Sequence, residues 1–149
     1  MIRTKWFTGA AELSDAHNIR RAVFINEQGV SEAQEMDGTD AGAIHLVAYD
    51  GAKPVATGRI LIENELYLLG RIAVLKEVRG QGYGDFVMRL LIRRAFELGG
   101  TRQTVHAQLQ AKGFYETLGF RATGAEYEEA GIPHVAMERE GDIAGPCGL

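Results

Sequence analysis

The chain has 149 residues, of which 46% are hydrophobic and 24% are charged, as in an ordinary globular protein of one domain. Its formal net charge of -4 argues against nucleic-acid binding, which uses a basic patch, and weakly favours a cationic partner such as an amine. No apolar run approaches the ~18 residues of a membrane span, and the first residues lack the apolar core of a signal peptide. Cys147 is the only cysteine, which excludes an intrachain disulfide framework and fits a cytoplasmic location.

Residue patterning in the first half predicts a strand, a helix, a long loop and three further strands. Ser14 is expected to cap the helix, and the acidic segment from Glu27 to Asp40 is expected to form the loop, with at most one helical turn. The short connections between the last three strands predict an antiparallel meander. The expected ranges are Ile2–Phe7 (strand), Ser14–Asn26 (helix), and Ile44–Tyr49, Val55–Ile62 and Leu66–Val74 (strands).

The second half predicts two helices and three strands. The strand ending at Val74, the long helix and the next strand form a strand–helix–strand unit, which implies a parallel pair with a right-handed crossover. The predicted fold class is therefore α/β, with a mixed, mostly antiparallel sheet, one parallel pair and helices on both faces. The expected ranges are Tyr83–Leu98 and Ala111–Leu118 (helices), and Thr104–Gln108, Arg121–Glu128 and His134–Glu138 (strands).

The stretch "RGQGYG", Arg79 to Gly84, stands between a predicted strand and a predicted helix. Unpaired N–H groups at a helix start attract an anion, and glycines let the backbone approach it. The loop lacks the Gly-Lys-Ser/Thr of a P-loop, and its G-x-G-x-G spacing differs from the dinucleotide fingerprint G-x-G-x-x-G. The residues alone leave two interpretations open, a phosphate cradle or a flexible glycine turn.

Two motifs together resemble the GNAT superfamily of N-acyltransferases. Arg79-x-x-Gly82-x-Gly84 is similar to its acyl-CoA motif, and "GFYETLGF", residues 113–120, is similar to its F-Y-x-x-L-G-F signature. The order of elements also resembles the GNAT fold, over nearly the whole chain, and "VFINEQGV" followed by "EMDGTD" resembles a bacterial subgroup of small GNAT proteins. We expect residues 1–140 to form one GNAT domain and residues 141–149 a C-terminal tail.

The resemblance implies acetyl-CoA, or another acyl-CoA, as cosubstrate. No metal is expected, because the histidines His17, His45, His106 and His134 show no metal-ligand spacing. The loop amides would hold the CoA pyrophosphate, the strand before the loop would pair with the pantetheine arm, and that strand would splay from the strand at 104–108. Gln108 stands where many relatives have an asparagine, and Phe114 would pack against the cofactor or the sheet. The implied cofactor-binding residues are Ile72, Ala73, Val74, Arg79, Gly80, Gln81, Gly82, Tyr83, Gly84, Gln108 and Phe114.

The resemblance also suggests catalytic roles. Tyr115 would protonate the leaving thiolate, the alternative being a packing aromatic. Relatives often carry a glutamate that acts as the general base on the strand before the loop. This chain has Gly70 and Arg71 near that position. His106 is the candidate base, the alternative being a core histidine.

Other roles in the reaction stay open from the sequence. A water chain to an acidic residue of the loop, Glu27, Glu35 or Asp37, is a further route for the proton. That acidic loop could attract a cationic acceptor or be only a solvated face. Arg71 could instead hold an acceptor carboxylate.

The predicted function is transfer of an acetyl or short acyl group from acyl-CoA to an amine of a small molecule or peptide, by direct attack in a ternary complex. Backbone amides near Ala73 would polarise the thioester carbonyl. The alternatives are a CoA-binding sensor that does little chemistry and, more distantly, a nucleotide-binding domain. A homodimer is expected by analogy with the fold, and Cys147 is interpreted as an incidental thiol of the tail rather than a nucleophile.

Overall fold

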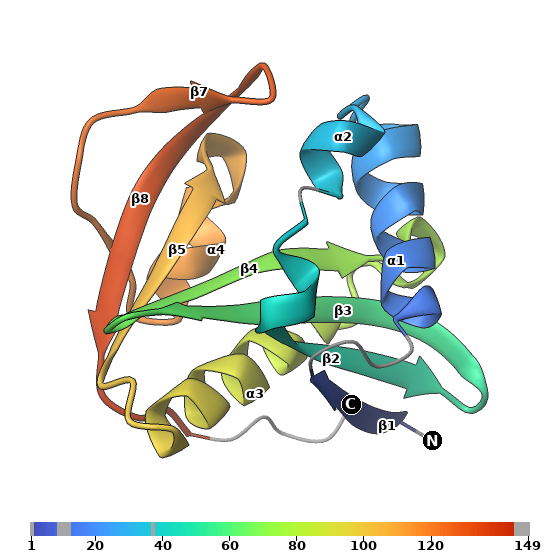
Figure 1. The fold of residues 1–149 in the computed structure, drawn as a ribbon, viewed down its shortest axis with the longest axis horizontal. Coiled ribbons are helices and arrows are strands. Elements are labelled where there is room, and N and C mark those ends of the chain that lie inside the picture. The colour runs from blue at the N-terminus through green and yellow to red at the C-terminus, as the bar shows by residue number, and fades with distance from the viewer. Residues whose placement is uncertain (1, 9–12, 37, 145–149) are drawn as a thin grey trace.

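A single mixed sheet runs through the protein, with the strand order β1-β2-β3-β4-β5-β8-β6 and with β7 paired to β8 (Figure 1). The computed structural model describes residues 2–8, 13–36 and 38–144. Its strands are β1 (Ile2–Thr8), β2 (Ala43–Asp50), β3 (Lys53–Glu63), β4 (Leu66–Val74), β5 (Arg102–Gln108), β6 (Arg121–Ala122), β7 (Tyr127–Glu129) and β8 (Ile132–Glu140). Its α-helices are α1 (Ser14–Arg20), α2 (Glu32–Glu35), α3 (Tyr83–Glu97) and α4 (Lys112–Thr117).

The parallel pair predicted from the sequence is β4 and β5. Only two pairs of residues are in register between these strands, Leu68 with Thr104 and Leu69 with Val105. Beyond Leu69 and Val105 the two strands part, while β4 stays paired with β3 and β5 with β8. The mixed sheet with one splayed parallel pair is therefore confirmed.

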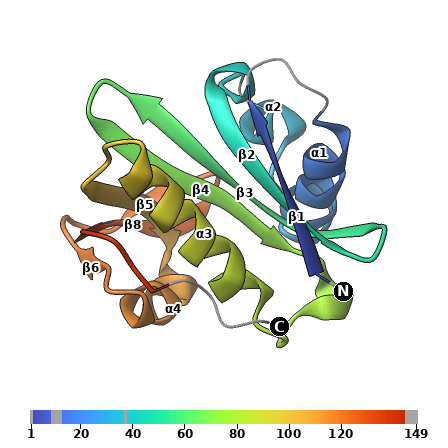
Figure 2. The same cartoon turned by 90° about the horizontal axis from the view of Figure 1, so that it is seen from below.

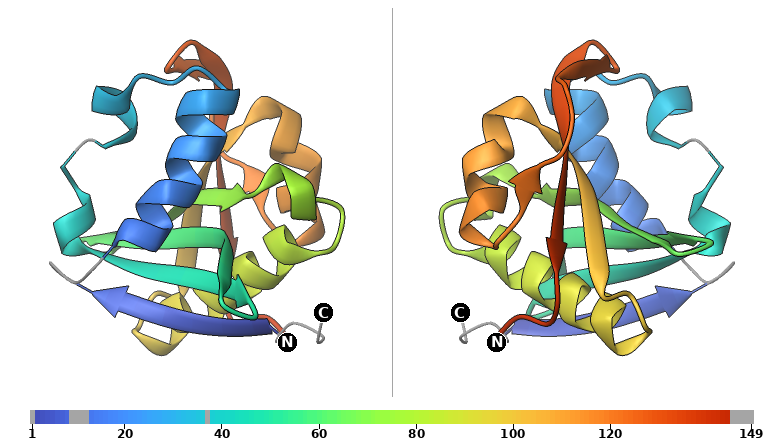
Figure 3. Two further views of the ribbon diagram at one scale, coloured as in Figure 1. Left: turned by 90° about the vertical axis from the view of Figure 1, so that its right-hand side faces the viewer. Right: turned by 90° about the vertical axis from the view of Figure 1, so that its left-hand side faces the viewer.

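The helices cover both faces of the sheet, as predicted. Figure 2 shows α3 and α4 on one side of β3 and β4, and α1 and α2 on the other. Burial agrees with this arrangement, since Val87, Leu91 and Ala95 of α3 belong to the larger core cluster. Ala16 and Ile19 of α1 pack with Ala73 in a second, smaller cluster. At the ends of the molecule, Figure 3 shows β1 far from the hairpin of β7 and β8.

A β-bulge interrupts β4 beside the point where β5 leaves it. Thr57 pairs with Ala73 and Arg59 with Gly70, so Arg71 and Ile72 together lie opposite Gly58. Arg71 has a φ of 51°, in the left-handed region that non-glycine residues rarely adopt. A bulge bends its strand and changes the direction of its side chains, and this one lies just beyond the last residue pair of β4 with β5.

The helical segment after β1 differs from the prediction. The α-helix ends at Arg20 and continues as a seven-residue π-helix, η1 (Arg21–Glu27). Ser14 is the first helical residue and Leu13 occupies the N-cap position, without a side-chain hydrogen bond, so the prediction of Ser14 as the cap is wrong. The described ranges also hold three short 3₁₀ helices: η2 (Asp40–Gly42), η3 (Lys76–Val78) and η4 (Leu109–Ala111).

The single strand predicted over residues 121–128 is also wrong. Two short strands, β6 and β7, occupy this region, and both pair with β8. The Thr123 N–H still donates to the Ala136 carbonyl of β8 at 3.0 Å, and the chain leaves β8 at the bend of Gly124.

β8 ends at Glu140, and Arg139 donates to the carbonyls of Gly141 and Asp142 just beyond it. The division into a domain and a tail stays a prediction, and Cys147 lies outside the described residues. No helix of the described ranges is long and apolar enough to cross a membrane.

Candidate active site

A cavity of about 900 Å³ lies where β4 and β5 part. Its walls come from β3, β4, the glycine loop, β5, α4, the hairpin of β7 and β8, and the segment from η1 to α2. The volume lies in the upper part of the range of small-molecule and cofactor sites. The cavity therefore brings together segments from most of the chain at the splayed strands.

The glycine loop forms one wall of this cavity. Arg79, Gly80, Gly82, Tyr83 and Gly84 line it, whereas Gln81 does not. Gly80 and Gly82 have φ values of 81° and 88°, which only glycine adopts readily, and Gly82 is the N-cap of α3. A Cβ at Gly80 would meet no atom within 4 Å, so the loop leaves open space for a ligand. A phosphate fits this arrangement, because the start of the 15-residue helix α3 faces the same space.

Two residues of the strand before the loop lie on the cavity wall, and the residue between them does not. Ile72 and Val74 line the cavity. Ala73 is 1% exposed and packs with α1 on the opposite face of the sheet. Ala73 therefore does not line the cavity, and its part in the predicted pantetheine contact stays a prediction.

The F-Y-x-x-L-G-F segment packs directly on the glycine loop. The Phe114 ring lies 3.6 Å from where a Cβ of Gly84 would be, so the two motifs touch. The end of α4 is a Schellman motif, in which the Phe120 N–H donates to the Tyr115 carbonyl at 3.2 Å and Gly119 has a φ of 91°. The Tyr115 and Phe120 rings meet edge-on, and this apolar contact of the motif fixes the Tyr115 ring.

Tyr115 lines the cavity although it is almost fully buried. Burial raises the pKa of its hydroxyl to about 12. The hydroxyl therefore keeps its proton throughout the physiological pH range, as a proton donor must.

His106 and Gln108 also line the cavity, on the β5 side. His106 is exposed, so its interpretation as a core histidine is wrong. The Gln108 amide donates to Gln28 Oε1 at 2.8 Å, which links β5 to the end of η1 across the cavity. Gln28 thus joins the site, and no sequence pattern indicated this contact.

Arg79 forms a two-pronged ion pair with Glu27 of η1. The two N–O distances are 2.8 and 2.7 Å, and Arg79 Nε donates to the Val74 carbonyl at 3.0 Å. The hydrogen bond from Arg79 lowers the pKa of Glu27. Glu27 is consequently a poor base, and it does not line the cavity.

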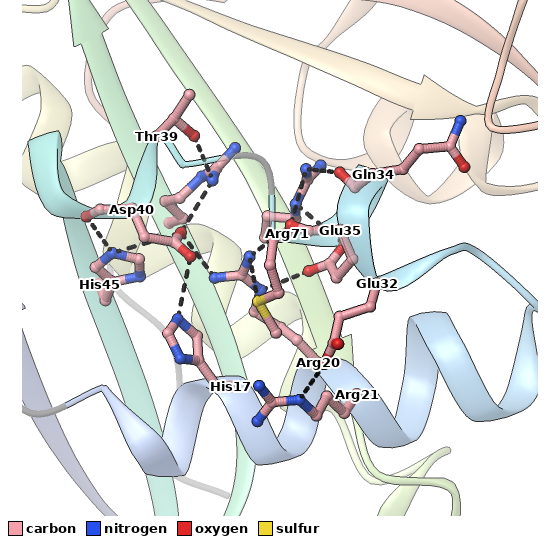
Figure 4. Close-up of polar contacts among 12 residues, drawn as sticks. His17, Arg20, Arg21, Glu32, Gln34, Glu35, Thr39, Asp40, His45 and Arg71 are labelled. Atoms are coloured by element: carbon pink, nitrogen blue, oxygen red, sulfur yellow. Dashed lines mark hydrogen bonds and ion pairs between the residues drawn. The ribbon is translucent and has the colours of Figure 1, made fainter.

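A buried cluster of charges supports the opposite wall, between α1, α2, η2 and β3 (Figure 4). Arg20, which is 1% exposed, pairs with Glu35 at 2.6 Å and with Asp40 at 2.9 Å. Arg59 donates to the same Asp40 oxygen at 3.1 Å, and Arg71 Nε lies 3.2 Å from Glu35 Oε2. Two acidic residues of the predicted loop are therefore buried ion-pair partners, and their interpretation as a solvated face is wrong; Asp37 lies outside the described residues.

Two histidines complete this cluster. His17 Nε2 lies 3.0 Å from Asp40 Oδ2, and His45 Nε2 donates to the Asp40 carbonyl at 3.0 Å. Burial raises the pKa of Asp40, but the hydrogen bonds and charges of Arg20 and Arg59 outweigh it and hold the pKa well below its usual value. Glu35, Arg59 and Arg71 line the cavity, so the cluster fixes the charged groups of one wall.

The wall formed by β7 and β8 was not predicted from the sequence. Glu129, Ala130, Ile132 and His134 line the cavity there. His134 pairs in register with Gln108, so both side chains lie on one face of the sheet. The alternation of residues along β8 could have placed His134 on that face, had its pairing with β5 been known. Among the described residues, no group of three acidic, histidine or cysteine side chains could hold a metal ion.

Comparisons with known proteins agree with this fold and site. The sequence model of the acetyltransferase (GNAT) domain matches residues 10–140. The chain is 42% identical to the uncharacterized protein YyaT of Bacillus subtilis, over 93% of this chain and 96% of that one. It is 38% identical to the uncharacterized N-acetyltransferase YjcF of the same organism, over 87% and 93% of the two chains.

Solved structures share the same architecture. The acyl-CoA N-acyltransferase from Pseudomonas aeruginosa superposes with a TM-score of 0.85 and 28% identity, over 93% of this chain and 99% of that one. A GNAT acetyltransferase from Elizabethkingia anophelis with acetyl-CoA bound shares the fold, with a TM-score of 0.71 and 13% identity over 93% and 97% of the chains.

Splayed strands, a glycine loop that opens a helix and an F-Y-x-x-L-G-F segment beside it define an acyl-CoA-dependent N-acetyltransferase. The chain belongs to the GNAT family.

Proposed function

We propose that the protein moves an acetyl or short acyl group from acyl-CoA to a primary amine of a small molecule or peptide, by direct attack in a ternary complex. The observation that carries this proposal is one cavity that joins the glycine loop, the splayed edge of β4 and Tyr115. The acetyl-CoA found in the E. anophelis relative supports the choice of cosubstrate.

Different segments of the chain would bind different parts of the acyl-CoA. The loop backbone from Gly80 to Gly84, with Gln81 and Tyr83, would bind the pyrophosphate, and Arg79 would add a positive charge. The unpaired edge of β4 at Ile72, Ala73 and Val74 would bind the pantetheine arm as an added strand. Gln108 and Phe114 would line the arm from β5 and α4.

The cosubstrate supplies an acyl group activated as a thioester. Backbone amides near Ala73 would polarise its carbonyl by hydrogen bonds to the oxygen. The acceptor nitrogen would then attack the carbonyl carbon while these amides stabilise the negative charge that develops on the oxygen. Tyr115 would donate its proton to the leaving sulfur, and its buried, protonated hydroxyl suits this role. His106 lines the cavity and is one candidate for the base. His134 is the second candidate.

The acceptor would carry a cationic amine before it reacts. Glu63 and Glu129 line the cavity and would attract such a group. Arg71, a candidate partner for an acceptor carboxylate from the sequence, already pairs with Glu35. We also infer a cytoplasmic homodimer from the family; light scattering of the purified chain tests its mass.

Thermal stabilisation and thiol release test the function together. Acetyl-CoA at 100 times its Kd should stabilise the protein by about 2.7 kcal/mol, whereas NAD and ATP at the same concentration should not. An amine panel of polyamines, amino acids, aminoglycosides and peptide N-termini should then release free CoA thiol. Stabilisation without turnover on any amine would favour the sensor; stabilisation by NAD or ATP alone would favour a nucleotide-binding domain.

A further inference from the structure

His134 differs from His106 in how firmly it is held on the cavity wall. Both histidines line the cavity, but His134 is 6% exposed whereas His106 is exposed. The Tyr127 ring stacks on His134, with centroids 5.8 Å apart and planes at 27°. His106 meets the same Tyr127 ring only edge-on, at 6.1 Å.

The hydrogen bond at Nδ1 fixes the proton of His134. Nδ1 lies 2.7 Å from the backbone carbonyl of Ile132, and a carbonyl oxygen can only accept. Nδ1 therefore carries the hydrogen, and in the neutral ring Nε2 carries the lone pair. This arrangement, in which one ring nitrogen is tied to a carbonyl, leaves the other ready to accept a proton. For His106, by contrast, no hydrogen bond within the described ranges selects a tautomer.

A carboxylate stands beside the free nitrogen. Glu129 Oε2 lies 3.8 Å from His134 Nε2, which is longer than a hydrogen bond. Glu129 can thus compensate the charge of an imidazolium without occupying the lone pair. The titratable groups that face His134 from the neighbouring strands are Glu129 and Tyr127 of β7 and, beyond the Tyr127 ring, His106 of β5.

We propose that His134 Nε2 is the general base that deprotonates the acceptor amine, an inference that rests on the proposed function. The ammonium gives one proton to Nε2, and the freed lone pair attacks the thioester carbonyl carbon. As the C–S bond breaks, the sulfur takes the Tyr115 proton, and the attacking nitrogen restores it to Tyr115. The products are the amide, the free CoA thiol and one proton, which leaves on His134 and passes to solvent.

The sharpest test removes the basic nitrogen of His134 and keeps a hydrogen bond to the Ile132 carbonyl. In His134→Asn the amide can still donate to the Ile132 carbonyl, but it cannot accept a proton. At pH 7 we expect kcat/KM for the best amine of the panel to fall about 100-fold or more, with acetyl-CoA affinity and unfolding midpoint unchanged. The deficit should shrink as the pH rises, because more of the free amine is already neutral. His134→Gly should regain activity when imidazole is added, which a purely structural role would not produce.

His106→Asn provides the matched comparison on the same wall. A loss carried by His106→Asn and absent in His134→Asn would overturn the inference while leaving the proposed function intact. Ring-nitrogen NMR of the wild type gives a readout without turnover, since the neutral His134 should show its hydrogen on Nδ1; a hydrogen on Nε2 would overturn the inference as well. Absence of acyl transfer by the wild type would remove the proposed function, and with it the base.

Discussion

Tyr115 combines a buried hydroxyl with a position on the cavity wall, and this combination gives a direct prediction. Tyr115→Phe removes the proton donor and retains the ring that packs against Phe120. We expect kcat to fall about 100-fold, with little change in stability, as measured by thiol release. Because its pKa is about 12, Tyr115 should produce no alkaline limb in the rate below about pH 11.

Tyr67→Phe is the matched control for Tyr115→Phe. The Tyr67 hydroxyl donates to the Leu98 carbonyl at 3.0 Å, outside the cavity. Its removal should leave the rate within a factor of about two, because it changes no group of the site. Equal rates for Tyr115→Phe and the wild type would remove Tyr115 from the mechanism.

Asp40 is the residue on which the buried charge cluster depends. Asp40→Asn leaves Arg20 and Arg59 without their shared carboxylate, so the free energy of unfolding should fall by about 3–5 kcal/mol. Its pKa lies below the ordinary 3.8, so its stabilising contribution is complete above about pH 5 and is lost as the pH falls below 3.8. The difference from wild type should therefore be largest at neutral pH and shrink in acid.

Urea denaturation across the pH range measures this effect. Glu32→Gln is the control, since the Arg21–Glu32 pair is exposed and 3.2 Å long. This control should change the free energy of unfolding by less than about 0.5 kcal/mol. If the difference in unfolding free energy between wild type and Asp40→Asn grew toward low pH, it would contradict a stabilising, ionised Asp40 carboxylate.

At the scale of elements, the glycine loop offers a test that separates strain from ligand contact. Gly82 and Gly51 both have left-handed φ values, of 88° and 62°, but only Gly82 lines the cavity. Gly82→Val and Gly51→Val should each lower stability by about 1–2 kcal/mol through backbone strain. Only Gly82→Val should also weaken CoA binding, by tenfold or more, in a calorimetric titration. Equal CoA affinity in both variants would contradict the cradle.

Most elements could be predicted because each has a local signal. The short turns that join β2 to β4, the helical spacing in α3 and the glycine after α4 all depend on near neighbours in the chain. Two local features departed from prediction: α1 begins at Ser14 without a side-chain cap, and a bend at Gly124 divides the strand expected over residues 121–128 into β6 and β7.

The site was predictable to the same extent. Each of its two motifs is contiguous in the sequence. Of the residues predicted to bind the cofactor or to act in catalysis, all except Gln81 and Ala73 line the cavity. The buried ion pairs join Arg20 to residues 15 and 20 positions away, and His134 reaches the cavity only through its pairing with β5. Such long-range contacts carry no periodic signal, so the sequence could not show them.

At the scale of the whole molecule, the two halves of the sheet share only the Leu68–Thr104 and Leu69–Val105 pairs. Beyond these pairs, no strand of the described residues lies beside the edge of β4 that faces the cavity. If acetyl-CoA pairs with this edge, amide hydrogen exchange in residues 70–74 should slow when it is added. Exchange in β1 should not change, because β1 pairs with β2 at the far edge of the sheet.

Exchange measured by mass spectrometry, with and without acetyl-CoA, tests this whole-molecule prediction. Protection confined to the glycine loop, with none in residues 70–74, would show that the pyrophosphate binds without the strand-like pairing. Uniform protection of every peptide would indicate global stabilisation in place of a local site.

In the π-helix η1, the number of residues determines the direction in which Glu27 and Gln28 point. A π-helical turn holds more residues than an α-helical one, and its hydrogen bonds reach one residue farther back, as when the Gln28 N–H donates to the Val23 carbonyl. Deletion of one residue here would let the segment relax to an α-helix and rotate its C-terminal end by about 100°. Glu27 and Gln28 would then turn away from Arg79 and Gln108. Insertions and deletions in this family should therefore spare residues 21–27 and gather in the loop between β6 and β7.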